Sequence, residues 1–238
     1  MIISLFGYGK MGKEIEQIAV QRGHQIGLKI NSSNSSDITK ENIKNTDVII
    51  EFSRPEFAKD NILFAIENNV PIVVGTTGWY EDYDFLKSQA LGKSGTLLTA
   101  TNFSVGVNIF FKINEYLAKI MNTQDAYDVY MKEIHHTQKL DAPSGTALTL
   151  AQQIIHNIDR KTKWTDKKTL DKSELTITSE RVDPAPGTHS ITYTSEIDDI
   201  EITHTAHNRK GFAFGSVLAA EFVKDKKGIF TMNDVLQF

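Results

Sequence analysis

The chain has 238 residues, of which 40% are hydrophobic and 24% are charged, a composition typical of one large or two modest globular domains. Its formal net charge of −4 argues against nucleic acid or an anionic membrane as a partner, because both call for a basic surface. The chain contains no cysteine, which excludes disulfide bonds, a thiolate nucleophile and a cysteine-ligated metal, and fits a reducing compartment.

The first residues, 2–6 with the sequence IISLF, form an apolar strand candidate that leads directly into a glycine-rich turn. They lack the basic segment and the cleavage site of a signal peptide. No apolar run approaches the roughly 18 residues that a membrane helix needs. We therefore expect a cytoplasmic protein with neither a nucleic-acid nor a membrane partner.

Strands and helices alternate along the first hundred residues. Helical periodicity predicts helices at 10–22, 55–68 and 81–90, and the second of these starts with a proline, which suits the first helical position. Short apolar runs predict strands at 2–6, 25–30, 47–52, 71–74 and 96–99. This alternation predicts a Rossmann-like parallel sheet with right-handed crossovers.

The pattern changes after Phe103. Helices are expected at 105–121, 145–158, 211–223 and 231–236, and runs rich in Tyr, Ile, Thr and Val predict strands at 126–134, 174–181, 188–195 and 199–205. The charged stretch 159–173 is predicted to be a surface loop or excursion. The fold class is therefore α/β, with a Rossmann-like domain followed by an α+β domain that has an antiparallel or mixed sheet.

A Gly-x-Gly-x-x-Gly turn follows the first strand and opens the first helix. The first two glycines let the backbone approach a pyrophosphate, and the helix start offers free N–H groups and the positive end of the helix dipole. An ordinary tight turn between a strand and a helix is the alternative. The candidate cofactor-binding residues here are Gly7, Tyr8, Gly9, Lys10, Met11 and Gly12.

The end of the second strand bears on the choice of cofactor. In dinucleotide-binding folds an Asp or Glu there usually binds the ribose 2′-hydroxyl, but this chain has Asn31 followed by Ser32. No carboxylate is present to repel a 2′-phosphate, which favours NADPH, or the use of both NADPH and NADH. The absence of an arginine at this place weakens the preference, and a plain solvated loop is the alternative.

Three further turns follow the third, fourth and fifth strands. The carboxyl ends of parallel strands border one crevice, so we expect these turns to complete a nicotinamide site. Each turn alone is also accounted for by ordinary turn chemistry. The candidate cofactor-binding residues are Ser53, Arg54, Gly75, Thr76, Thr77, Ala100, Thr101, Asn102 and Phe103.

The segment 133–147, EIHHTQKLDAPSGTA, contains several polar residues suited to catalysis or to ligand binding. Two adjacent histidines suit general acid–base catalysis near neutral pH, and the lysine that follows can bind a carboxylate or donate a proton. The Ser-Gly-Thr run opens a helix, so its N–H groups form an anion seat. The set suits a small carboxylate-bearing substrate, and the candidate residues are His135, His136, Lys139, Ser144, Gly145 and Thr146.

Metal ligation, a surface histidine pair and a structural cap are the alternatives for this segment. Carboxylates at a useful ligand spacing are missing, so zinc is disfavoured and we expect no metal. In an extended strand His135 and Lys139 would lie about 13 Å apart. The chain must therefore bend after His136 if both residues act on one molecule.

Positions 133–147 match, throughout, the signature of the dihydrodipicolinate reductases, and this long motif is highly specific. The resemblance spans nearly the whole chain. Other segments that resemble this family are 7–12, 51–56 (EFSRPE), 75–78 (GTTG), 102–108 (NFSVGVN), 202–209 and 212–215.

The resemblance implies an NAD(P)H-dependent oxidoreductase of diaminopimelate and lysine biosynthesis. Members of the family reduce 4-hydroxy-tetrahydrodipicolinate, the cyclic product of pyruvate and aspartate semialdehyde, to tetrahydrodipicolinate with loss of water. By resemblance, His135 is the acid–base residue, and Lys139 supplies a proton or stabilises the nitrogen-bearing intermediate. His136 would hold one substrate carboxylate, and Gly145 with Thr146 would hold the other.

The resemblance also implies a division of the chain and an assembly. Residues 1–103 and 211–238 would form the dinucleotide-binding domain, and residues 104–210 the substrate-binding and tetramerisation domain. Family members are typically homotetramers whose second-domain sheet builds the assembly.

The sequence departs from the family pattern in places. Asn31 replaces the usual acidic residue, the glycine loop is one residue shorter than in many members, and residues 181–189 contain two prolines in place of a glycine-rich run. Two other functions stay open. A Rossmann dehydrogenase acting on an amino-acid semialdehyde often relies on a cysteine, which is absent, and a non-catalytic dinucleotide sensor has no need for His135 and Lys139.

Overall fold

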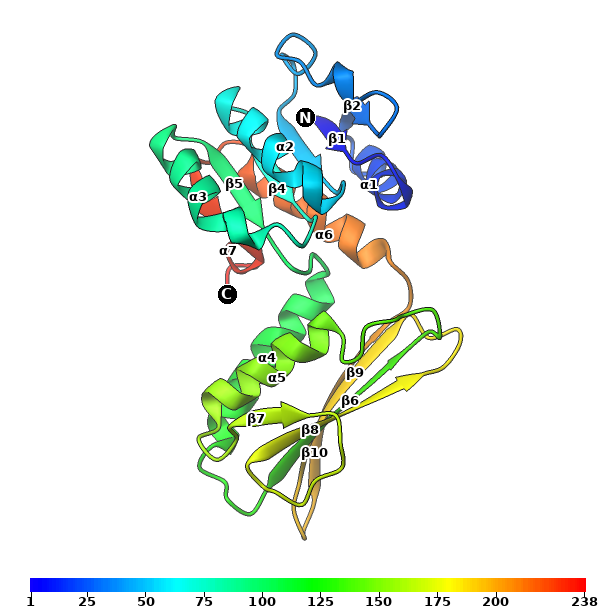
Figure 1. The fold of residues 1–238 in the computed structure, drawn as a ribbon, viewed down its shortest axis with the longest axis vertical. Coiled ribbons are helices and arrows are strands. Elements are labelled where there is room, and N and C mark those ends of the chain that lie inside the picture. The colour runs from blue at the N-terminus through cyan, green and yellow to red at the C-terminus, as the bar shows by residue number, and fades with distance from the viewer. The chain divides into compact units, whose positions relative to one another are not determined.

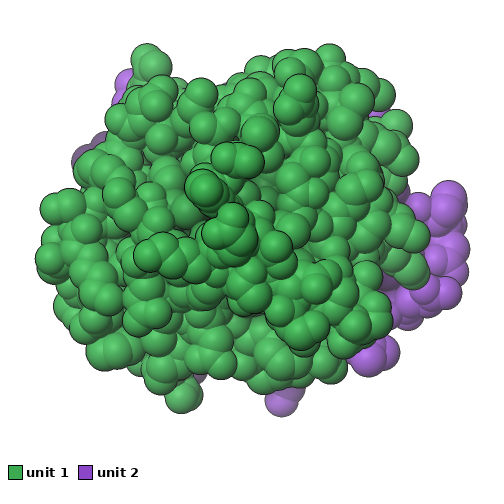
Figure 2. All heavy atoms as spheres, turned by 90° about the horizontal axis from the view of Figure 1, so that it is seen from above, with its two compact units in different colours: residues 1–105, 210–238 green, residues 106–209 purple.

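The computed structural model describes residues 1–238, which form two compact units (Figures 1 and 2). Unit 1 comprises Met1–Val105 and Lys210–Phe238, and unit 2 comprises Gly106–Arg209. None of the helices combines the length and the apolar character that a membrane span requires.

Unit 1 is built on a six-stranded sheet in the order β11-β5-β4-β3-β1-β2, and all of its strand pairs are parallel. This confirms the predicted Rossmann-like sheet. Its strands are β1 (Ile2–Phe6), β2 (Gln25–Ile30), β3 (Val48–Glu51), β4 (Ile72–Val74), β5 (Thr96–Thr99) and β11 (Gly228–Phe230). Its helices are α1 (Lys10–Gln21), α2 (Pro55–Glu67), α3 (Tyr83–Gly92), α6 (Lys210–Val223), α7 (Met232–Leu236) and the 3₁₀ turns η1 (Ser35–Asp37) and η2 (Tyr80–Asp82).

Apolar side chains on the two faces of this sheet form two cores. Val48 and Ile50 of β3 belong to the core shared with α1 and α6, whereas Ile49 belongs to the core shared with α2 and α3. This alternation follows from the pleat of a strand, which turns successive side chains to opposite faces. A strand covered on both faces is apolar almost throughout, as β3 is.

Unit 2 combines a five-stranded mixed sheet with two helices. The sheet order is β10-β9-β6-β8-β7, where β9 is antiparallel to β6 and β10 and β8 is parallel to β6 and β7. Its core joins α4 and α5 to alternate side chains of β6, β8 and β9, so both helices cover one face. The elements are α4 (Val105–Met121), β6 (Asp128–His135), α5 (Gly145–Asn157), β7 (Lys163–Thr165), β8 (Glu174–Arg181), β9 (Gly187–Thr194) and β10 (Asp199–Ala206).

Two short strands differ from the prediction. The stretch 159–173 was predicted to be a surface loop or excursion, but β7 lies within it and pairs with β8 at the edge of the sheet. The KWT sequence of β7 has no alternation of apolar and polar residues. Because β7 is an exposed edge strand, it has no buried face that would require this pattern. β11 was also missed, since its three residues gain their strand geometry only by pairing with β5.

Candidate active site

In unit 1, the glycine turn between β1 and α1 is shaped by close backbone contacts. Gly7 has a φ of +105°, and a Cβ atom there would lie 2.0 Å from the carbonyl oxygen of Phe52. A Cβ at Gly12 would lie 2.6 Å from the carbonyl oxygen of Gly7. Both positions therefore require glycine whether or not a ligand binds.

Gly9 is different, because nothing lies within 4 Å of the position of a Cβ at this residue. Gly9 is the N-cap residue of α1 and makes no side-chain cap. The helix therefore begins with N–H groups that no side chain caps, next to a residue that leaves open space, and both features suit a phosphate group. This fits the pyrophosphate of a dinucleotide.

A cavity of about 790 Å³ adjoins this turn. Its size lies within the usual range for nucleotide and cofactor pockets, roughly 300–1,000 Å³. It brings together predicted residues from three separate turns. Those that line it are Gly7, Tyr8, Gly9, Asn31, Ser32, Ser53 and Arg54, together with Phe6, Ile30, Ser35, Ile38, Phe52, Phe57, Asp60 and Asn61.

The remaining predicted cofactor residues do not line this cavity. Gly75 lies against the ring of Phe52, since a Cβ there would meet that ring at 2.1 Å. Phe103 is buried in the core of unit 1, with its ring centroid 5.7 Å from that of Phe52. The other predicted residues outside the cavity lining are Lys10, Met11, Gly12, Thr76, Thr77, Ala100, Thr101 and Asn102.

At the Asn31 end of the cavity no side chain offers a carboxylate directly after β2. The Oδ1 atom of Asn31 accepts hydrogen bonds from the N–H of Ser33 at 2.8 Å and from its hydroxyl at 2.6 Å. Lys29 is held by Glu16, with 2.8 Å between Nζ and Oε1. Arg54 lies on the cavity wall and is largely exposed, with its Nε 3.2 Å from Oε1 of Glu56 and its guanidinium 4.9 Å from the ring centroid of Phe57.

A buried carboxyl group fixes the turn that carries Arg54. Glu51 accepts hydrogen bonds from the N–H of Ser53 at 3.0 Å, from the Ser53 hydroxyl and from the amide of Asn61 at 3.4 Å. Burial raises the pKa of Glu51 above its usual range, and these hydrogen bonds oppose the shift. The turn after β3 is therefore held by its own strand and by α2.

In unit 2, the chain turns directly after β6. β6 ends at His135, and the N–H of Lys139 donates to the carbonyl oxygen of His136 at 3.1 Å. The bend that the sequence required after His136 is thus confirmed. His135 is buried, whereas His136 and Lys139 are only partly so.

The helix that follows this turn, α5, has a side-chain cap at its N-terminus. Ser144 is the N-cap residue of α5, and its Oγ accepts a hydrogen bond from the N–H of Ala147 at 3.2 Å. The N–H of Ser144 itself donates to both carboxylate oxygens of Glu133, at 3.2 and 3.1 Å. The backbone N–H groups of Gly145 and Thr146 remain at the helix start to meet an anion.

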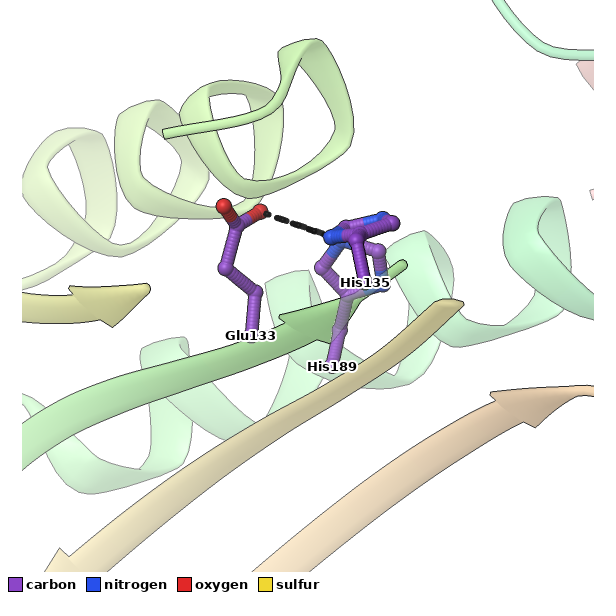
Figure 3. A group of neighbouring side chains, drawn as sticks. All are labelled: Glu133, His135 and His189. Carbon is purple, nitrogen blue, oxygen red and sulfur yellow. Dashed lines mark ion pairs between the residues drawn. The ribbon is translucent and has the colours of Figure 1, made fainter. Parts of the chain in front are cut away.

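Glu133 is the centre of this end of the unit (Figure 3). Its side chain is fully buried, and its carboxylate lies 3.1 Å from Nη2 of Arg181, 3.6 Å from Nε2 of His189 and 3.7 Å from Nδ1 of His135. Burial alone would raise the pKa of Glu133, but hydrogen bonds from His189 and Ser144 outweigh it and hold the pKa well below its usual range. Glu133 is therefore a carboxylate at neutral pH.

His135 has the opposite response to burial. Burial lowers the pKa of His135 to about 4. The negative charge of Glu133 opposes this shift, whereas His189, Lys139 and Arg181 add to it. His135 is therefore neutral at pH 7 before a ligand binds. A dianionic ligand beside it would favour its protonation, as a second negative charge adds to that of Glu133.

The donor atoms of Glu133, His135 and His189 all lie within 4.8 Å of one another, close enough to surround a metal ion. The carboxylate is, however, already engaged by the guanidinium of Arg181 and by the N–H of Ser144. A guanidinium 3.1 Å from a metal-binding carboxylate would repel the ion. The group fits a compensated hydrogen-bond network better than it fits a metal site.

Arg181 connects this network to the turn after β6. Its Nε donates to the carbonyl oxygen of Lys139 at 3.1 Å, and its Nη2 donates to that of Asp141 at 2.5 Å. The ammonium of Lys139 pairs with the carboxylate of Asp141 at 2.8 Å. On the other side of the turn, Thr137 donates to Asp183 from its N–H at 3.1 Å and from its hydroxyl at 2.6 Å.

Glu133, Arg181 and His189 were not among the predicted site residues. Glu133 precedes His135 by two residues, and the period of a strand places both on one face, so this signal was present in the sequence. Arg181 and His189 reach the site only through the register of the sheet, which pairs Arg181 with His135 and His189 with Glu133. No local pattern in the sequence specifies that register.

Comparison with known proteins extends over both units. The family model described as "Dihydrodipicolinate reductase, N-terminus" matches residues 1–103, and "Dihydrodipicolinate reductase, C-terminus" matches residues 106–236. A 4-hydroxy-tetrahydrodipicolinate reductase of Christiangramia forsetii is 46% identical over 238 residues, covering 99% of this chain and 98% of its own. One of Neisseria gonorrhoeae is 33% identical over 228 residues, covering 93% and 83%.

A solved structure shares the fold. The dipicolinate-bound dihydrodipicolinate reductase of Paenisporosarcina sp. TG-14 superimposes with a TM-score of 0.81 and 22% identity, covering 98% of both chains. The two family models together account for nearly every residue of this chain. The chain belongs to the dihydrodipicolinate reductase family.

Proposed function

We propose that the protein reduces 4-hydroxy-tetrahydrodipicolinate to tetrahydrodipicolinate, with loss of water, in diaminopimelate and lysine biosynthesis. The observation that carries the proposal lies at one end of unit 2. There the buried His135, the turn 136–139 that carries Lys139 (the lysine turn) and the N-terminus of α5 meet around Glu133. Such a set binds a small dicarboxylate and exchanges protons with it. When bound, the reduced nicotinamide of NADPH or NADH supplies the hydride.

The side chains divide this work by their charge and position. His135 is the acid–base residue, and the ammonium of Lys139 donates a proton to the reduced ring or stabilises its nitrogen. His136 binds one substrate carboxylate. The N-terminus of α5, through Ser144, Gly145 and Thr146, binds the other.

Unit 1 then binds the cofactor and unit 2 the substrate. The residues proposed for pyrophosphate binding are those of the glycine turn, where Gly9 leaves open space before α1. Asn31, Ser32, Ser53 and Arg54 line the same cavity and are proposed to contact the nucleotide half. The turns at Gly75–Thr77 and Ala100–Phe103, together with Lys10, Met11 and Gly12, complete the proposed set.

We further propose a homotetramer in the cytoplasm that binds neither nucleic acid nor membranes. Within unit 2 both helices cover one face of the sheet, so the other face, which carries the exposed Tyr130, is free for assembly. The net charge of −4 supports the absence of a polyanionic partner.

A coupled absorbance assay tests the function. The substrate is generated in the cuvette from pyruvate and aspartate semialdehyde by the preceding synthase, and the loss of reduced-nicotinamide absorbance is followed. Oxidation that depends on the synthase is the expected result. A protein that binds NADPH but never oxidises it would instead be a dinucleotide sensor.

The cavity around Asn31 favours NADPH over NADH, because no carboxylate follows β2 and the exposed Arg54 lies on the same cavity wall. Changing Asn31→Asp should therefore lower the NADPH/NADH ratio of kcat/KM by about tenfold, since the new carboxylate repels a 2′-phosphate. The measurement is kcat/KM with each cofactor. Asn45→Asp adds the same charge at an exposed position outside the cavity and should leave the ratio unchanged; equal ratios in both variants would remove Asn31 from cofactor selection.

A further inference from the structure

Glu133 contacts three segments of unit 2 without belonging to the proposed chemistry. It accepts the N–H of Ser144 at the start of α5, and it pairs with Arg181 of β8. It also lies 3.6 Å from His189 of β9 and 3.7 Å from His135 on its own strand. Ser144, Arg181 and His189 therefore reach the same carboxylate from three different elements, and Figure 3 shows His189 and His135 beside it.

We propose that Glu133 and Arg181 are positioning residues. They fix the N-terminus of α5, which is proposed to bind a substrate carboxylate, and the lysine turn relative to His135. This proposal rests on the proposed function. Neither residue is assigned contact with the substrate. Their effect is to hold in one geometry the groups that do make contact.

The N-terminus of α5 is held directly by Glu133. The N–H of Ser144 points to both carboxylate oxygens, at 3.2 and 3.1 Å, so the carboxylate sets the direction in which the chain enters the helix. The Oγ of Ser144 lies 3.1 Å from Nε2 of His189 and also caps the helix. The first turn of α5 is therefore held from β6 and from β9 at once.

The lysine turn depends on Glu133 through Arg181. One guanidinium bonds the carbonyl oxygens of Lys139 and Asp141 as well as Oε1 of Glu133. The planar fork of arginine can hold three acceptors in fixed directions, whereas the single ammonium of lysine cannot. The carboxylate of Glu133 orients the guanidinium of Arg181, and this guanidinium in turn fixes the backbone that carries Lys139.

Charge, not shape alone, is required at Glu133. The carboxylate is fully buried, and the groups that donate to it include the N–H of Ser144 and the guanidinium of Arg181. The isosteric amide of glutamine has one acceptor and one donor end, so its NH₂ group would face either Ser144 or Arg181 as a repelling donor. The guanidinium would also lose its counter-charge in a partly buried place.

His135 completes the network at the end of β6. Its ring meets that of His189 edge-on, with 5.0 Å between centroids. The charged and titratable groups facing it are Glu133 on β6, His189 on β9, Arg181 on β8 and Lys139 in the turn. Because the carboxylate lies 3.7 Å from Nδ1 of His135, a shift of the carboxylate or the loss of its charge changes the electrostatic surroundings of the ring.

The test compares Glu133→Gln and Arg181→Met with wild type and with Glu196→Gln, a charge-loss control at an exposed residue between β9 and β10. We expect Glu133→Gln to lower kcat/KM by about 100-fold, as a misplacement of about 1 Å does, and to weaken the binding of dipicolinate, a stable dicarboxylate probe. Arg181→Met should lower kcat strongly but change the dipicolinate Kd little, because it releases the lysine turn and leaves the N–H of Ser144 on Glu133.

Melting temperature and the Kd for NADPH are measured on the same samples. The expected result is an NADPH Kd near wild type and a melting temperature that falls but stays well above the assay temperature, so that the kinetic losses do not follow the folded fraction. If kcat/KM per folded molecule stays within about threefold of wild type in Glu133→Gln, the proposal is overturned. If Glu133→Gln does not fold, Arg181→Met, whose site is partly exposed, decides the question through its split between kcat and Kd. A wild-type protein without turnover would overturn the proposed function instead.

Discussion

Changing His135→Gln should lower kcat by about 10²–10⁴-fold, the usual contribution of a positioned acid–base group, while NADPH binding stays unchanged. His135 ends β6 at the buried centre of the unit 2 network, next to the lysine turn and the α5 N-terminus. Glutamine fills a similar volume and forms hydrogen bonds, but it cannot carry a proton at neutral pH. Steady-state kinetics with both cofactors and a direct NADPH titration measure the two effects.

A matched control is His156→Gln, at an exposed position on α5 away from the helix start. It should have wild-type kinetics. Near-normal turnover in His135→Gln would remove this residue from the chemistry, and loss of NADPH binding in that variant would show that the defect reaches unit 1.

The same variant has an expected pH signature in stability. The pKa of His135 is lowered from 6.5 to about 4, by burial first and against the opposing charge of Glu133, with His189, Lys139 and Arg181 adding to the lowering. As the pH falls from 6.5 towards 4, the unfolded chain takes up a proton at His135 that the folded chain does not, so wild type loses stability over this window. His135→Gln lacks this loss, and its urea midpoint should fall less between these pH values. Parallel pH curves would contradict the assigned burial effect.

Changing Lys139→Met should lower kcat by about 10²–10³-fold, because it removes the proposed proton donor and the positive charge proposed to stabilise the substrate nitrogen. The turn itself should survive, since Arg181 binds the carbonyl oxygen of Lys139 and not its side chain. The released partner, Asp141, is largely exposed and can be solvated. The measurement is kcat together with the dipicolinate Kd, which should change less than kcat.

Two further variants define what the lysine contributes. Lys163→Met removes an exposed lysine that pairs with Glu174 at 2.9 Å on the edge strand, and it should leave kcat unchanged. Lys139→Arg keeps the charge but donates a proton poorly, so it should restore substrate affinity more than kcat. Full recovery of kcat in Lys139→Arg would assign the residue a purely electrostatic role.

Most of the fold could be predicted from the sequence because short-range patterns specify it. The helix at 105–121 and the strands at 2–6, 25–30, 96–99 and 174–181 have the predicted bounds, since apolar periodicity and turn residues mark their ends. β7 and β11 were missed because each has only three residues. They become strands through pairing with β8 and β5, which no local pattern records.

The candidate site was predictable to the extent that it is contiguous in sequence. The turn after β6 and the start of α5 lie within 15 consecutive residues, 133–147, so His135, Lys139 and Ser144 could be recognised together. Arg181 and His189 are 46 and 54 residues beyond His135 in the chain and meet it only through strand register. The turn at Arg54 likewise joins Asn31 only because β1 places their strands in one sheet.

The transfer of deuterium from NADPH labelled at C4 of the nicotinamide into the product tests directly whether the protein passes a hydride from the cofactor to the substrate ring. Substrate made by the preceding synthase is incubated with wild-type protein, and the product is analysed by mass spectrometry. We expect tetrahydrodipicolinate that carries deuterium from only one of the two C4 stereoisomers of the labelled cofactor, because a folded site presents a single face of the nicotinamide. Product without deuterium from either stereoisomer, or no consumption of the cofactor by a protein that binds it, would show that the protein is not this reductase.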